Sequence, residues 1–161
     1  MRSGKMTAAV LAALIATLAT IGGTRAASDL SRQEPIEIKV ELGRPGTHVF
    51  VPNRLRFETG KLYKVVLTNP SNDPHYFTSH AFTQFIFTRK VQVTPLRDGK
   101  LVTLVEFKGA IREIEVYPGH SAEWWFVPVA TGRVTDLECG IRGVDGKTYK
   151  DHGMVGEIVI E

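Results

Sequence analysis

Two segments of the chain contain side chains that commonly bind metal ions. The first, residues 69–77 (NPSNDPHYF), contains His75. The second begins at Cys139 and ends with His152 and Met154. Thiolate and thioether sulfurs combined with imidazoles favour copper over harder ions, and two His, one Cys and a weak Met form electron-transferring copper sites. If the fold brings the segments together, these side chains predict one copper ion that alternates between Cu(I) and Cu(II).

Each of these residues also has an ordinary structural interpretation. Cys139 is the only cysteine, so the chain forms no internal disulfide, and a free cysteine packs well in a hydrophobic core. Met154 by itself is more typical of a core residue, and His75 by itself of a surface imidazole. Their combination favours the ligand interpretation.

The other histidines carry weaker signals. His48 lies within a strand pattern and is interpreted as a packing or surface residue, and His120 follows a Pro-Gly turn and is expected in solvent. The chain contains no Gly-x-Ser-x-Gly motif, no phosphate-binding glycine loop and no paired-histidine zinc-protease motif. The sequence therefore predicts a metal-binding protein rather than an enzyme of those classes.

The elements that must position these residues are mainly strands. Apolar and polar residues alternate over Ile36 to Leu42, as in a half-buried strand. Similar patterns predict strands at residues 48–51, 62–68, 111–117, 121–129, 133–139 and 155–161, and a hairpin joining 91–93 to 101–105 around 97–100. Helical spacing within 78–90 predicts one short helix. Short strands at turn-marked intervals indicate an all-β, two-sheet sandwich.

The N-terminus has the pattern of an export signal. Residues 1–26 have a positive start, an apolar run and small residues at the end, so we expect a signal peptide cleaved after about Ala26. We expect residues 27–35 to be a flexible lead-in and residues 36–161 to form one domain. The signal peptide contains three of the 20 Lys and Arg residues and no acid, so the remainder has 17 bases and 17 acids. This balance gives no argument for a nucleic-acid partner, and we expect no stable membrane insertion after cleavage.

Two motifs in the predicted domain resemble the small periplasmic cupredoxins of the plastocyanin and azurin type. One is Asn69 followed by His75-x-Phe77, and the other is Glu138-Cys139 with the ending Gly153-Met154-Val155-Gly156-Glu157-Ile158-Val159-Ile160. The resemblance covers Ile36 to Glu161 in strand order. It implies a Greek-key sandwich that binds one type 1 copper ion, with His75, Cys139 and Met154 at the family's ligand positions.

The fourth ligand departs from the family pattern. The family places a second His a few residues after the Cys, but the positions counted from Cys139 or back from Met154 are occupied by Arg142, Gly143, Val144, Tyr149 and Lys150. His152, after a lengthened loop over residues 140–151, is the remaining candidate. Residues i and i+2 of an extended segment face the same side, so His152 and Met154 are expected to reach one ion. His80 is the reserve.

The function implied by these residues is one-electron transfer in the periplasm, with a cytochrome or a copper oxidoreductase as a possible redox partner. Two alternatives remain open. The chain could sequester copper in a tolerance role, or it could be a copper-free interaction module.

Overall fold

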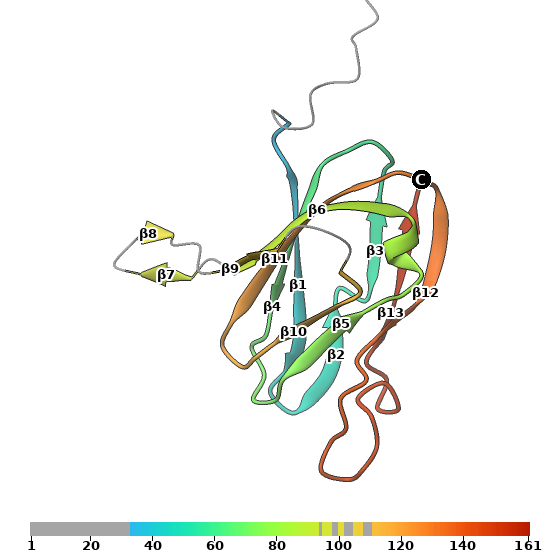
Figure 1. Ribbon diagram of the computed structural model, residues 1–161. Helices are drawn as coiled ribbons and strands as arrows, with labels where there is room; N and C mark the ends of the chain where they lie inside the picture. The colour runs from blue at the N-terminus through green and yellow to red at the C-terminus, as the bar shows by residue number, and fades with distance from the viewer. Residues whose placement is uncertain (1–32, 94, 98–99, 102–104, 108–110) are drawn as a thin grey trace, which may run out of the picture.

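The computed structural model describes residues 33–93, 95–97, 100–101, 105–107 and 111–161 of the chain (Figure 1). The predicted signal peptide, residues 1–26, lies outside the described residues, as does all but the end of the predicted lead-in, residues 27–35. No helix in the described part of the chain is long and apolar enough to cross a membrane.

The described residues form two packed sheets and a separate small hairpin. The larger sheet has the order β2-β1-β4-β11-β6-β9, and the second has the order β10-β5-β12-β13-β3. The hairpin β7–β8 lies to one side of the sandwich in Figure 1. The strands are β1 (Ile36–Arg44), β2 (Thr47–Val51), β3 (Arg54–Phe57), β4 (Tyr63–Thr68), β5 (His75–Thr78), β6 (Ile86–Val93), β7 (Leu96–Arg97), β8 (Lys100–Leu101), β9 (Val105–Phe107), β10 (Glu113–Val116), β11 (Ser121–Pro128), β12 (Gly132–Glu138) and β13 (Val155–Ile160).

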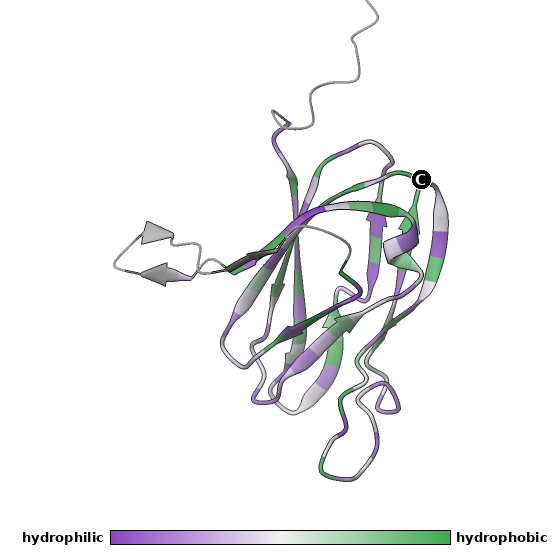
Figure 2. Ribbon diagram, in the orientation of Figure 1, coloured by the Kyte–Doolittle hydropathy of each residue, from purple (hydrophilic) through white to green (hydrophobic). Residues whose placement is uncertain are grey.

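The all-β, two-sheet sandwich predicted from the sequence is confirmed. Strands with one buried face carry both hydrophilic and hydrophobic residues, as Figure 2 shows along β3 and β12. Aromatic side chains fill the space between the sheets. For example, Trp124 and Phe126 on β11 contact Phe82 edge to face. The neighbouring Trp125 points outward, where Lys90 lies over its ring.

The ambiguous segment 78–90 contains one short helical turn. Residues Phe82–Gln84 form a 3₁₀-helix, which agrees with the predicted short helical insertion. The segment otherwise contributes the end of β5 and the start of β6, because β-branched and aromatic residues suit a sheet. The predicted hairpin is also present, since β6 pairs with β9 and β7 with β8, although residues 98–99 of its turn lie outside the described part.

Three adjacent strands of the second sheet bring the candidate ligands to one end of the sandwich. β5 and β13 both pair with β12 in antiparallel fashion. Cys139 directly follows β12, Met154 directly precedes β13, and His75 is the first residue of β5. The connection between β12 and β13 extends from this end of the molecule (Figure 1).

Candidate metal centre

His75 and Cys139 form the centre of the candidate site. Both side chains have an exposed fraction of 0%, and the Sγ of Cys139 lies 3.8 Å from the Nδ1 of His75. Metal bonds of about 2.3 Å to sulfur and about 2.0 Å to imidazole, at an angle of about 120°, separate two donor atoms by about 3.7 Å. The observed spacing therefore suits two ligands of one ion.

The surroundings of Cys139 partly offset the cost of a buried thiolate. Burial raises the pKa of the thiol, while the backbone N–H groups of Tyr76 and Ile141 act in the opposite direction because they hydrogen-bond to the sulfur. The Tyr76 nitrogen lies 3.2 Å from Sγ. A metal ion that replaced the thiol proton would be bound by a sulfur that already accepts these hydrogen bonds.

His75 is held in its neutral form. Burial, together with a smaller contribution from the nearby charge of His48, lowers the pKa of His75 from 6.5 to about 4, although Asp73 acts in the opposite direction. At neutral pH the ring carries one proton, and its Nδ1 atom faces the sulfur of Cys139. The Nε2 atom is buried without a hydrogen-bond partner among the described residues, so the polar contact of this ring is on the Cys139 side.

Gly43 explains how the ring fits into this space. Gly43 lies at a register shift in β1 and has φ +73°, a conformation that favours glycine. A Cβ atom at this position would lie 2.3 Å from the Nε2 of His75. The missing side chain therefore provides the volume that the imidazole occupies.

Met154 lies directly beside Cys139. The backbone N–H of Cys139 donates to the carbonyl of Met154 at 3.2 Å, and the backbone N–H of Met154 donates to the carbonyl of Tyr149 at 2.9 Å. The Met154 side chain is fully buried. His75, Cys139 and Met154 thus all lie at this end of the sandwich, and an imidazole, a thiol and a thioether are donor groups that suit copper.

The lengthened loop between Cys139 and Met154 is an ordered hairpin followed by a turn. The backbone N–H of Tyr149 donates to Ile141, that of Lys150 to Cys139, and that of Gly143 to Lys147. The tip contains Gly146, whose φ of +80° permits the tight reversal. The extra residues therefore pair with one another and leave Cys139 and Met154 adjacent.

The structure places His152 on the surface. The Nε2 of His152 lies 2.9 Å from a carboxylate oxygen of Asp145 at the hairpin tip. Residues 151–153 form a turn, and Gly153 has φ +92°, so His152 and Met154 do not share one side of an extended segment. That premise of the sequence analysis was wrong, because i and i+2 share a side only in an extended chain. The reserve residue, His80, is exposed between β5 and the 3₁₀-helix.

Tyr149 and His48 were not assigned to the site by the sequence analysis. Tyr149, at one of the positions where the family has its second His, is buried and its ring centre lies 5.0 Å from that of His75. His48 stacks on Tyr149 with ring centres 3.8 Å apart. The sequence did contain a signal for His48. It lies two residues before Phe50 on the same strand, so the two side chains face the same side, and Phe50 points into the core.

Among the described residues, no three His, Cys, Asp or Glu side chains lie close enough to share a metal ion. The donor residues that lie at this end of the sandwich are His75, Cys139 and Met154, and the backbone of Met154 is hydrogen-bonded to that of Cys139. This set fits a soft ion such as Cu(I) and is one imidazole short of the set predicted from the sequence.

Asn69 stabilises the loop that leads into His75. Its side-chain amide donates to the carbonyls of Asp73 and Val116, and its side-chain oxygen accepts hydrogen bonds from Ser71. Asn69 thus fixes residues 69–74 to the end of β10 and orients the entry to β5.

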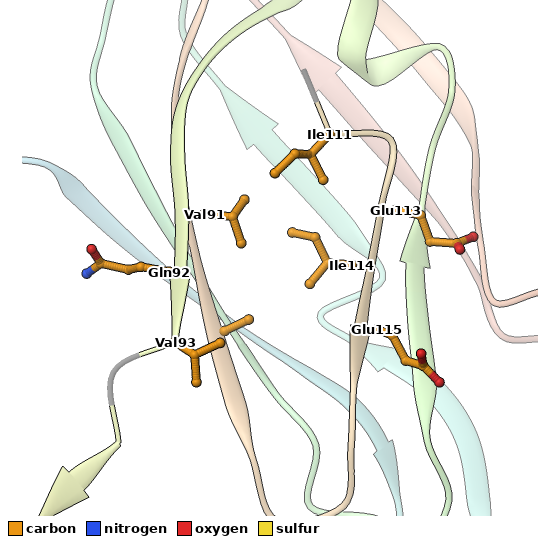
Figure 3. A pocket seen from close by; sticks show the side chains of 8 residues that line it. Val91, Gln92, Val93, Ile111, Glu113, Ile114 and Glu115 are labelled. Atoms are coloured by element: carbon orange, nitrogen blue, oxygen red, sulfur yellow. The ribbon is translucent and has the colours of Figure 1, made fainter. Parts of the chain in front are cut away.

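The sandwich also has an apolar cavity away from these residues. A hollow of about 230 Å³ opens between β6, β10 and β11. In Figure 3, Val91, Ile111 and Ile114 point into it, whereas Glu113 and Glu115 point away. Among the described residues, the side chains that point into this cavity are apolar.

Comparison with known proteins identifies the fold. No family model matches the sequence, and no curated protein matches it. Two multicopper oxidases, from Campylobacter jejuni and from the hyperthermophile Aquifex aeolicus, superpose with TM-scores of 0.53 each, over 80% of this chain, at 16% and 14% identity. The "blue" copper protein auracyanin A from Chloroflexus aurantiacus is similar over 80% of this chain and 100% of its own, with a TM-score of 0.47 and 13% identity.

The likeness to the two oxidases shows the fold alone. This chain spans 30% of the length of each of them. The expected cupredoxin-like sandwich is thereby confirmed.

Proposed function

We propose that this cupredoxin-like chain binds one copper ion and carries single electrons with it. His75 and Cys139 would be the strong ligands, and Met154 would be the weak sulfur donor. The observation that carries the proposal is the buried pair of Nδ1 and Sγ atoms, 3.8 Å apart, next to the buried Met154.

The protein's own groups prepare the site for the ion. When bound, copper supplies a couple between Cu(I) and Cu(II). The neutral His75 offers a ring-nitrogen lone pair at any pH above about 4, and the N–H of Tyr76 stabilises negative charge on Cys139. Burial of all three donors excludes water, so little solvent must reorganise when the charge changes.

A carrier suits this arrangement better than a catalyst. The substrate of a catalytic metal must reach the ion, whereas the three donor side chains here are completely buried. We further propose export to the periplasm, on the basis of residues 1–26, and electron exchange there with a cytochrome or a copper oxidoreductase.

The electron-transfer proposal is tested by voltammetry of the copper-loaded protein. We expect one reversible one-electron wave, with no ion lost over repeated cycles. Cys139→Ser should remove the wave, and His80→Ala, at an exposed position, should leave it unchanged. Copper release on each oxidation would contradict the carrier function.

One observation favours a second function, in which the chain holds Cu(I) for sequestration. His152 is engaged with Asp145 at the surface, which leaves two sulfurs and one imidazole as donors. Such a soft set favours Cu(I) over Cu(II). Tight Cu(I) binding combined with irreversible voltammetry would support this function over electron transfer.

A further inference from the structure

His48 lies beside the candidate ligands although it comes from the other sheet. It is on β2, whose neighbour β1 contains Gly43, the residue that makes room for His75. The ring centres of His48 and His75 are 5.7 Å apart, and the ring planes are inclined by 68°. His48 therefore stands next to the one imidazole that already faces Cys139.

The distance between these two rings suits a shared ion. With a metal–nitrogen bond of about 2.0 Å, the centre of an imidazole ring lies about 3.2 Å from the metal. Two such rings on one ion then have centres about 5 to 6 Å apart, so the observed separation of 5.7 Å places the His48 ring close enough for a rotation of its side chain to complete the site.

His48 also has an unused nitrogen. Among the described residues, the buried side-chain nitrogen and oxygen atoms without a hydrogen-bond partner are the Nδ1 of His48 and the Nε2 of His75. A buried polar atom left unpaired is destabilising, so a structure normally supplies a partner. A metal ion is one such partner for the nitrogen of His48.

His152 is placed less well for the same task. Its ring centre is 5.8 Å from that of His48 on the solvent side, and its Nε2 already contacts Asp145. Tyr149 stacks on His48 and also lies beside His75. It therefore occupies the space that an imidazole from the 140–151 loop would need in order to reach His75.

We propose that His48, and not His152, supplies the second imidazole of the copper site. The inference rests on the proposed copper-binding function. Since no three such side chains among the described residues are within reach of one ion in the structure as it stands, the His48 side chain must rotate toward Cys139 when copper binds. The completed set would combine two imidazoles, one thiolate and the thioether of Met154.

The test is a count of imidazole nitrogens on bound Cu(II) by pulsed electron paramagnetic resonance. We expect two imidazoles in the wild type and one in His48→Phe, which retains a ring that can stack on Tyr149. The affinity for Cu(II) should fall at least tenfold in His48→Phe. His152→Ala and His80→Ala are the matched controls, and both should retain two imidazoles.

Two imidazoles in His48→Phe, or the loss of one in His152→Ala, would overturn the inference. Loss of copper binding in Cys139→Ser and His75→Ala, together with an unchanged His48→Phe, would reject the role of His48 and retain the proposed function. Unchanged binding in Cys139→Ser would reject both.

A measurement on the wild type avoids dependence on any variant. When Cu(I) is added to protein labelled with ¹⁵N in its histidines, we expect the resonance of one His48 ring nitrogen to shift and those of His152 to stay. The opposite pattern would overturn the inference.

Discussion

At the scale of single residues, the burial of His75 makes the stability of the metal-free protein depend on pH. The folded-state pKa of about 4 lies below the ordinary value of 6.5. Between these values an unfolded chain binds a proton at His75 and the folded protein does not, so the free energy of unfolding falls as pH decreases through this window.

This linkage predicts a loss of up to about 3 kcal/mol in the free energy of unfolding between pH 6.5 and pH 4, since one pKa unit corresponds to about 1.4 kcal/mol. Carboxylates also titrate in this range, so the comparison is with His75→Gln, measured by denaturant unfolding. The variant should lose less stability than the wild type, while His80→Gln should behave as the wild type does. Equal pH dependence in wild type and His75→Gln would contradict the burial argument.

The same residue scale shows what sequence patterns could and could not provide. Cys139 and Met154 lie at the ends of strands that local alternation predicts, 133–139 and 155–161, whereas the short strand β5, which begins at His75, is not among the predicted strands. The place of His152 depends on the pairing inside the 140–151 hairpin and on the turn at Gly153. Such pairing is set by contacts across the loop rather than by local spacing, so the sequence did not predict it.

At the scale of elements, the register shift in β1 controls the position of His75. Gly43 lies at this shift with a positive φ, and any side chain there would meet the imidazole. Gly46, in the turn that follows, has a similar φ of +77°, but a Cβ added there would meet no atom within 4 Å. Substitutions at the two glycines therefore distinguish the effect of backbone strain from the effect of displacing the His75 ring.

We predict that Gly43→Ala lowers the copper affinity at least tenfold, because the new methyl group pushes His75 away from Cys139. Gly46→Ala should cost about 1–2 kcal/mol of stability for a left-handed alanine and leave the copper affinity unchanged. Copper titrations of both variants provide the comparison. An equal loss of affinity in the two variants would mean that strain in the β1–β2 connection, and not the space beside His75, is responsible.

The Cys139–Met154 connection shows why a long insertion is compatible with a compact site. The inserted residues form their own backbone hydrogen bonds, and Cys139 still donates to the carbonyl of Met154. The length of this loop was evident from the sequence, but its closure into a hairpin required the structure.

At the scale of the whole molecule, the site joins both sheets. His75, Cys139 and Met154 belong to the β5, β12 and β13 end of one sheet, whereas Gly43 and His48 belong to β1 and β2 of the other. The alternation of Ile36 to Leu42 predicted the strand that contains Gly43. It did not predict that this strand lies against β5 of the other sheet. Contacts between sheets depend on the packing of the aromatic core around Trp124, which no local pattern specifies.

An ion that binds only the folded protein should stabilise the entire fold. Binding to the folded state alone adds about 2.7 kcal/mol to the free energy of unfolding when free copper is about 100 times the dissociation constant. We predict this gain for the wild type in denaturant unfolding with copper, and none for Cys139→Ser. A gain of the same size in Cys139→Ser would place the ion elsewhere on the protein.

The most direct test of the copper site is an absorbance titration of the metal-free protein with Cu(II). Ligation by Cys139 predicts an intense visible band from charge transfer between thiolate and copper. The band should saturate at one equivalent and be absent in Cys139→Ser. A colourless wild-type protein at saturating copper, or an identical spectrum in Cys139→Ser, would contradict the assignment of Cys139 as a ligand.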